Sequence, residues 1–301
     1  MTDLLCLGEP LVEFVRLEDG SYKRGIGGDT SNAAISAARQ GASVGYLTAL
    51  GTDRFGDAIL DVWSEEGIDT THVHRSATAQ TGIYFIDPDP QGRFFTYYRS
   101  GSAASLLRAE DLPETPFRTA RCLHLSGITL AVSEDLRKTA FAAMSMAKDA
   151  GASVSLDTNL RLQLWDIGTA RSITHDAAGL ARIIVTSLDD SEHLTGLTNP
   201  DHVADFYHDL GAEIVLVTMG GDGCRLSALD VRETIPAAPA SPIDSTGAGD
   251  SFSGAFLAWW LETGDPVSAA RYAAIVAART VSGLGAVSPI PRREDVLSRA
   301  L

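Results

Sequence analysis

The sequence contains few cysteines and few basic residues, and each shortage excludes some classes of protein function. Only three cysteines occur in 301 residues, an odd number without metal-ligand spacing, so we expect buried thiols in a reducing compartment. Lys and Arg total 24 against 39 Asp and Glu, giving a net charge of −15. A basic face for nucleic acid or an anionic membrane is therefore not expected. With so few cations, each arginine near a ligand site gains weight.

Long apolar runs and the common ATP-binding motifs are also missing. No segment approaches the ~20 apolar residues of a membrane span. The start, Met1–Gly8, lacks the basic residues and apolar run of a signal peptide, so we expect a cytoplasmic protein. The glycine-rich P-loop with its lysine and the protein-kinase motifs are absent, so ATP would need another arrangement.

Short apolar runs alternate with longer helical stretches along the chain. The runs expected as buried strands are 4–7, 44–49, 122–125, 153–156, 183–186 and 214–217. The stretches expected as helices are 30–40, 53–66, 134–150, 200–210, 250–262 and 267–282. This alternation predicts an α/β fold with a doubly wound, mostly parallel sheet flanked by helices, in one domain of residues 1–301.

Two segments depart from this alternation. Residues 11–17 alternate apolar and charged side chains, and residues 82–99 indicate a hairpin of strands 83–86 and 94–99 joined by a turn at 87–92. Such strands fit poorly into a parallel sheet. We therefore expect a small separate sheet, a lid formed by about residues 11–27 and 82–102.

The segment 244–250, Asp-Ser-Thr-Gly-Ala-Gly-Asp, carries the strongest chemical signal. A glycine-rich turn that opens a helix directs unpaired backbone N–H groups and the positive end of the helix dipole toward an anion. Asp250 would oppose an anion unless it takes a proton from a nucleophile. The alternative for an aspartate at a helix start is a simple N-cap.

This segment resembles the D-x-x-G-A-G-D signature of the ribokinase-like carbohydrate kinases. Residues 27–34, Gly-Gly-Asp-Thr-Ser-Asn-Ala-Ala, followed by residues 51–56, resemble a second signature of that family. The resemblance covers essentially the whole chain. It implies a ribokinase-like fold with a small β-sheet lid that covers the sugar and often mediates dimerisation. It also implies that Asp250 is the catalytic base and that the amides of Gly247, Ala248, Gly249 and Asp250 form the anion hole.

The resemblance implies ATP and Mg²⁺ as cofactors. The expected nucleotide-binding residues are Ser187, Thr218, Gly220, Gly223, Gly247, Gly249 and Ala274. The Gly220–Gly223 turn is explained equally well by a tight hairpin. Where the family often has N-x-x-E for the metal, this chain has Ser187-Leu188-Asp189-Asp190, leaving Asp190 as metal candidate and a helix N-terminus as alternative. The family would also place a monovalent cation such as K⁺ near 244–246.

Two arginines favour an acid sugar as substrate. Arg99 follows the predicted hairpin, and Arg161 follows a strand end, where ligands bind in open α/β sheets. A guanidinium matches a carboxylate, whereas a neutral hexose needs none. Together with their neighbours, these residues resemble the 2-keto-3-deoxygluconate kinases. This implies that Tyr84, Tyr97, Arg99 and Arg161 bind the keto-acid end, and Gly28 and Asn32 the hydroxyls.

Two other functions stay open from the sequence. One is a kinase for a neutral sugar, of the fructokinase or ribokinase type, or for a nucleoside, and such an enzyme would be indifferent to both arginines. The other is a binding-only regulator for a sugar or nucleotide on the same fold, against which Asp250 argues. The motifs do not distinguish the gluconate from the galactonate epimer. A homo-oligomer, by default a dimer through the lid, is expected.

Overall fold

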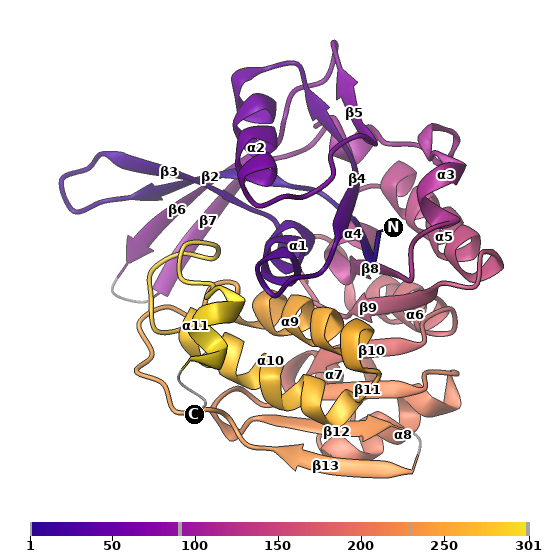
Figure 1. The fold of residues 1–301 in the computed structure, drawn as a ribbon. Coiled ribbons are helices and arrows are strands. Elements are labelled where there is room, and N and C mark those ends of the chain that lie inside the picture. Colours follow the sequence, from indigo (N-terminus) through magenta and orange to yellow (C-terminus); the bar gives the residue numbers. More distant parts are fainter. Residues whose placement is uncertain (1, 90–91, 229, 299–301) are drawn as a thin grey trace.

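The computed structural model describes residues 2–89, 92–228 and 230–298. Within them the chain forms a nine-stranded sheet covered by helices and a separate four-stranded sheet (Figure 1). In the view of Figure 1 the smaller sheet extends away from the body at the left. The predicted α/β fold with a small separate sheet is thus confirmed.

The large sheet has the strand order β13-β12-β11-β10-β9-β8-β1-β4-β5. All neighbouring pairs from β5 to β11 are parallel, and β12 and β13 add antiparallel strands at one edge. The six predicted strands are confirmed to within two residues at their ends. The strands are β1 (Leu4–Leu7), β4 (Val44–Gly51), β5 (Val73–Ser76), β8 (Cys122–Ser126), β9 (Ser153–Asp157), β10 (Ile183–Ser187), β11 (Ile214–Thr218), β12 (Cys224–Ala228) and β13 (Val231–Ile235).

Alternate residues of the central strands supply two cores, one on each face of the large sheet. In β1, Leu4 and Cys6 enter the first core, while Leu5 and Leu7 enter the second. Both faces are therefore apolar, which explains why these strands appear in the sequence as unbroken hydrophobic runs. All three cysteines are buried and free, as expected.

Helices cover each face and fill the two cores. On the first face lie α1 (Asp29–Arg39), α2 (Arg54–Glu65), α9 (Ala248–Thr263), α10 (Pro266–Thr280) and α11 (Arg293–Leu297). On the second lie α3 (Glu114–Phe117), α4 (Gly127–Ala131), α5 (Glu134–Asp149), α6 (Ile167–Ala178), α7 (Leu188–Thr195) and α8 (Pro200–Asp209). The six predicted helices are confirmed, although α9 begins two residues earlier than expected. No helix in the described part of the chain is long and apolar enough to cross a membrane.

The small sheet has the order β3-β2-β6-β7, built from β2 (Leu11–Arg16), β3 (Tyr22–Gly27), β6 (Ile83–Asp89) and β7 (Gly92–Tyr98). The predicted hairpin is present as the antiparallel pair β6 and β7, with Tyr84 opposite Tyr97. The predicted turn at 87–92 is too long, because backbone pairing continues to Asp89 and Gly92. Its middle residues, 90 and 91, lie outside the described residues.

Candidate active site

The start of α9 presents backbone amides without a side-chain cap. Gly247 is the N-cap, with a left-handed φ of 75°, and a Cβ there would lie 2.8 Å from the Ala286 carbonyl oxygen. In the described part of the chain the N–H groups of Gly249 and Asp250 have no hydrogen-bond partner. The Ala248 amide, expected in the anion hole, already donates to the Ser245 carbonyl at 3.2 Å. The free amides and the helix dipole favour an anion here.

Asp250 is held by the first turn of α1. Asn32 Nδ2 donates to Asp250 Oδ2 at 2.8 Å, while Asn32 Oδ1 is buried without a partner among the described residues. Burial and the nearby charge of Asp29 raise the pKa of Asp250 to about 7. A carboxylate with this pKa is suited to accept a proton near neutral pH.

A cavity of about 720 Å³ in front of α9 gathers the predicted substrate residues. It lies at the carboxyl ends of the parallel strands, where ligands bind in open α/β sheets. Its walls combine side chains from α1, the small sheet, the segment after β9 and the start of α9. The predicted residues that line it are Gly28, Asn32, Tyr84, Tyr97, Arg99, Arg161, Ser187, Asp190, Thr218, Gly247, Ala248, Gly249 and Asp250.

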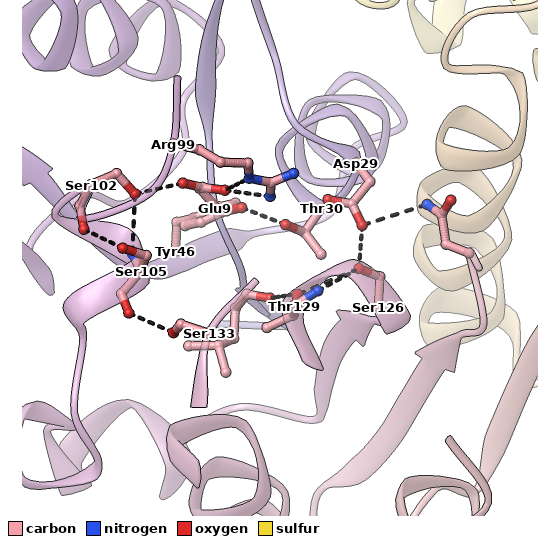
Figure 2. Close-up of polar contacts among 12 residues, drawn as sticks. Glu9, Asp29, Thr30, Tyr46, Arg99, Ser102, Ser105, Ser126, Thr129 and Ser133 are labelled. Atoms are coloured by element: carbon pink, nitrogen blue, oxygen red, sulfur yellow. Dashed lines mark hydrogen bonds and ion pairs between the residues drawn. The ribbon is translucent and has the colours of Figure 1, made fainter. Parts of the chain in front are cut away.

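The two predicted arginines differ in their partners. Arg99 Nε donates to Glu9 Oε2 at 2.6 Å, and Ser102 Oγ donates to the other Glu9 oxygen at 2.6 Å (Figure 2). This ion pair is almost fully buried, so the charge of Arg99 is already balanced by Glu9, although Arg99 lines the cavity as predicted. Arg161 is exposed, donates to the Leu160 carbonyl at 2.8 Å, and has no ion pair among the described residues.

The predicted tyrosines form an aromatic wall of the cavity. Tyr84 and Tyr97 stack at 5.4 Å between ring centroids, as their opposite positions in the β6–β7 ladder require. The Tyr84 hydroxyl donates to Glu13 Oε2 at 2.5 Å. Tyr84 therefore lines the cavity with its hydroxyl proton already donated.

A second cavity of about 620 Å³ adjoins the first across Thr218, Ser245, Ala248 and Gly249. It is lined mainly by small apolar residues, which suits a flat aromatic base. The predicted nucleotide residues that line it are Thr218, Gly220, Gly223, Gly249 and Ala274.

The predicted hairpin at the Gly220–Gly223 turn is confirmed. The turn links the antiparallel strands β11 and β12 through a 3₁₀ turn at Gly220–Asp222. A Cβ on Gly223 would lie 2.1 Å from the Ile235 carbonyl oxygen, so packing alone demands glycine there. Glycines of the same turn also line the second cavity, and their role in nucleotide binding stays a prediction.

Ser187 and Asp190 occupy the N-terminus of α7, as the alternative interpretation expected. Ser187 Oγ accepts from the Asp190 amide at 3.0 Å and caps the helix. Asp190 Oδ2 accepts from the Leu160 amide at 3.0 Å, and burial raises the pKa of Asp190. No group of three or more metal-ligating side chains occurs within the described ranges. A Mg²⁺ ion here would take most of its ligands from phosphates and water.

The segment expected near a monovalent cation forms a closed loop. Asp244 Oδ1 accepts from the Thr246 amide at 2.9 Å, and Asp244 Oδ2 accepts from the Gly285 amide at 2.9 Å. The loop containing Gly285 is thereby held against the start of α9.

Sequence reasoning missed several polar residues of the first cavity. Asp157 is the last residue of β9 and Asn159 lies just beyond it. Asp29 starts α1, and Glu9 follows β1. Burial and the charge of Asp250 raise the pKa of Asp157 to about 8. The sequence did show that several of these residues lie at or just after the ends of predicted strands. The sequence analysis used that position only for Arg161.

Known proteins resemble this chain along its full length. The family described as pfkB family carbohydrate kinase matches residues 1–293. A 2-dehydro-3-deoxygluconokinase of Thermoproteus tenax is 31% identical to this chain. The match covers 100% of this chain and 95% of the relative. Fructokinase-1 of Oryza sativa subsp. japonica is 32% identical, and the match covers 98% of this chain and 96% of the relative. Among solved structures, a fructokinase with bound ATP from Xylella fastidiosa has a TM-score of 0.91 and 29% identity. The match covers 98% of this chain and 97% of that structure's chain.

Proposed function

The chain belongs to the pfkB family of carbohydrate kinases, and from this premise we propose that it phosphorylates the terminal hydroxyl of 2-keto-3-deoxygluconate. This compound is the 2-dehydro-3-deoxygluconate named in the Thermoproteus tenax relative. The observation that carries the proposal is Arg161, a guanidinium without an ion pair among the described residues, in a sugar-sized cavity whose other charged residues are several carboxylates and the paired Arg99. A substrate carboxylate is the natural partner of that cation.

Asp250 acts as the general base. Asn32 fixes one carboxylate oxygen, so the other is free to accept the proton of the terminal hydroxyl. As that proton leaves, the hydroxyl oxygen becomes a better nucleophile toward phosphorus. The raised pKa of Asp250, about 7, matches its basicity to this task.

The start of α9 stabilises the negative charge of the transferred group. The amides of Gly249 and Asp250 are free to donate, and the helix dipole adds to their effect. ATP fits the two adjoining cavities, with the adenine in the apolar one lined by Gly223 and Ala274 and the phosphates beside Gly249. ATP supplies the phosphoryl group, and Asp190 would orient water on an accompanying Mg²⁺.

The small sheet covers the sugar in this proposal. Tyr84 and Tyr97 on β6 and β7 line the first cavity, so movement of this sheet would open or close it. Residues 11–27 and 82–102 then form the lid of a single kinase domain, 1–301. A lid that closes on the sugar also excludes water from the phosphoryl group.

Release of ADP tests the proposal directly. Purified protein with ATP and Mg²⁺ is given 2-keto-3-deoxygluconate, fructose, ribose or adenosine, and the initial rates are compared. Turnover confined to the keto acid, lost in large part in Arg161→Ala, supports the proposal. Turnover of fructose with indifference to Arg161→Ala contradicts it.

One observation favours a neutral sugar as the second candidate. Glu9 already neutralises Arg99, so only one of the two arginines is free for a carboxylate. The Oryza sativa relative is named a fructokinase at similar identity. A fructokinase would need only the hydroxyl contacts, Asp250 and the start of α9.

A further inference from the structure

Asn159, which lies just beyond the end of β9, has an unusual backbone conformation. Its φ is 32°, and among the described residues other than glycine it alone has a positive φ. A positive φ is uncommon for a residue with a side chain, although asparagine tolerates it better than most. Such conformations persist only where the surrounding structure holds them, and they cluster at binding sites. Asn159 also lines the first cavity, so this conformation lies within the candidate site.

Both neighbours of Asn159 are anchored to other elements. The Thr158 amide donates to the Val185 carbonyl at 2.9 Å, which ties this residue to β10. A Cβ on Gly127 of α4 would lie 2.0 Å from the Thr158 carbonyl oxygen, so α4 packs closely against the same residue. On the other side, the buried Leu160 side chain packs with residues of α6 and α7. The chain must therefore change direction within the one residue between these anchors.

The backbone of Leu160, directly after this turn, holds two residues of the first cavity. Its amide donates to Asp190 Oδ2 at 3.0 Å, and its carbonyl accepts from Arg161 Nη1 at 2.8 Å. The direction of that amide depends on the torsion angles of the preceding residue, Asn159. One turn therefore places both the guanidinium proposed for the acid end of the sugar and the carboxylate proposed for the metal side.

We propose that Asn159 is a positioning residue whose left-handed backbone directs both Arg161 and Asp190 into the cavity. Its side chain makes one long contact, from Nδ2 to Asp29 Oδ2 at 3.5 Å, so the backbone is the stronger constraint. A change at this turn should weaken acid-sugar binding and metal binding together. The inference rests on the proposed function, because it takes Arg161 as the residue that binds the acid end.

Glycine and alanine at position 159 separate a backbone role from a side-chain role. Both substitutions remove the side-chain amide and its contact with Asp29. Glycine adopts a positive φ without penalty, whereas alanine disfavours it. Asn159→Gly should therefore behave like wild type, and Asn159→Ala should not. The matched control is Gly151→Ala, just before the start of β9 and outside the first cavity, where φ is 81° and a new Cβ meets open space.

The test compares wild type and these three variants in binding and in thermal unfolding. Calorimetry without ATP gives the affinity for 2-keto-3-deoxygluconate, and electron paramagnetic resonance of Mn²⁺ with ADP gives the affinity of the metal side. We expect Asn159→Ala to weaken acid-sugar binding about 5- to 30-fold, the factor that corresponds to the usual cost of a left-handed conformation. Mn²⁺ binding should weaken in the same variant. Asn159→Gly should stay within about twofold of wild type in both affinities. Gly151→Ala should lower Tm without either effect.

Several outcomes would overturn the inference. Equal losses of affinity in Asn159→Gly and Asn159→Ala would mean that the side chain acts directly. A loss of Tm in Asn159→Ala with both affinities intact would mean that the turn serves the fold alone. If Asn159→Ala does not fold, Asn159→Gly still decides, because it lacks the side chain: retained affinities support the inference and lost affinities overturn it.

The same experiment separates this inference from the proposed function. If wild type binds fructose and not the keto acid, the proposed acid-sugar function fails. The Mn²⁺ affinities of Asn159→Ala and Asn159→Gly then still decide whether the turn positions Asp190.

Discussion

Asn32 Nδ2 lies 2.8 Å from Asp250 Oδ2, so the first turn of α1 fixes the carboxylate that opens α9. The two helices can approach closely because Gly254 faces α1, where a Cβ would lie 2.1 Å from the Ala33 carbonyl oxygen. A further hydrogen bond, from Ser36 Oγ to the Ser251 carbonyl at 2.8 Å, joins the same helices. The two sequence signatures of the family thus meet in one contact.

Asp250→Asn should bind sugar and ATP but lose most turnover. Asparagine keeps the size of the side chain and cannot take the hydroxyl proton, so kcat should fall by about 10²- to 10⁴-fold. Single-turnover kinetics and calorimetric binding of the sugar measure the two effects separately. A variant with near-normal kcat would remove Asp250 from the role of base.

The activity should depend on the ionisation of Asp250. Burial and Asp29 raise the pKa of Asp250 to about 7, and only the ionised form accepts a proton. The kcat/KM for the sugar should therefore fall about tenfold per pH unit below that pKa. A profile that stays flat down to pH 5 would mean that another group is the base.

The raised pKa of Asp250 also makes the stability of the fold depend on pH, but stability should fall as pH rises, whereas activity should rise. The folded protein binds the Asp250 proton more tightly than the unfolded chain, whose aspartates have a pKa of about 3.9. The resulting stabilisation is present below that unfolded value and is lost as pH rises through about 7. Asp250→Asn, neutral at every pH, should therefore gain more in Tm over wild type at pH 8 than at pH 5. Equal gains at both pH values would contradict the raised pKa.

The sequence predicted the large sheet well because its strands are buried on both faces. Runs such as Leu4–Leu7 carry no polar residue, which leaves little choice of structure. The α6 helix was not predicted, because its polar and small residues give a weak helical pattern.

The candidate site was predicted where it depends on local motifs and missed where it depends on distant pairing. The residues around Asp250 form one continuous motif, and the structure places them at one helix start. By contrast, Glu9 and Arg99 are separated by 90 positions, and only the folded chain shows that one neutralises the other. Asp29 was passed over because its neighbours in the cavity come from β8 and from the segment after β9.

Arg161→Ala and Arg99→Ala should have different consequences. Loss of Arg161 removes a cation without an ion pair, so KM for the keto acid should rise about 10- to 150-fold with little change in Tm. Loss of Arg99 leaves Glu9 buried without its partner, which typically costs about 3–5 kcal/mol of stability. Kinetics and thermal unfolding of both variants check this. Equal Tm losses in the two variants would contradict the structural distinction between the arginines.

Gly254→Ala should weaken both the fold and the catalysis. The added methyl group would push against the Ala33 backbone and Ser36, and such overpacking costs typically about 1–3 kcal/mol. Separation of α1 from α9 would also displace Asn32 from Asp250, so kcat should fall more than KM for ATP changes.

The control is Gly168→Ala in α6, where the new Cβ meets only the Asp166 side chain, at 3.1 Å. That variant should change Tm only slightly, because the new Cβ meets a single side-chain oxygen at the start of the helix and no backbone atom. If Gly254→Ala matched it in Tm and kcat, the close packing of the two helices would not be what positions the base.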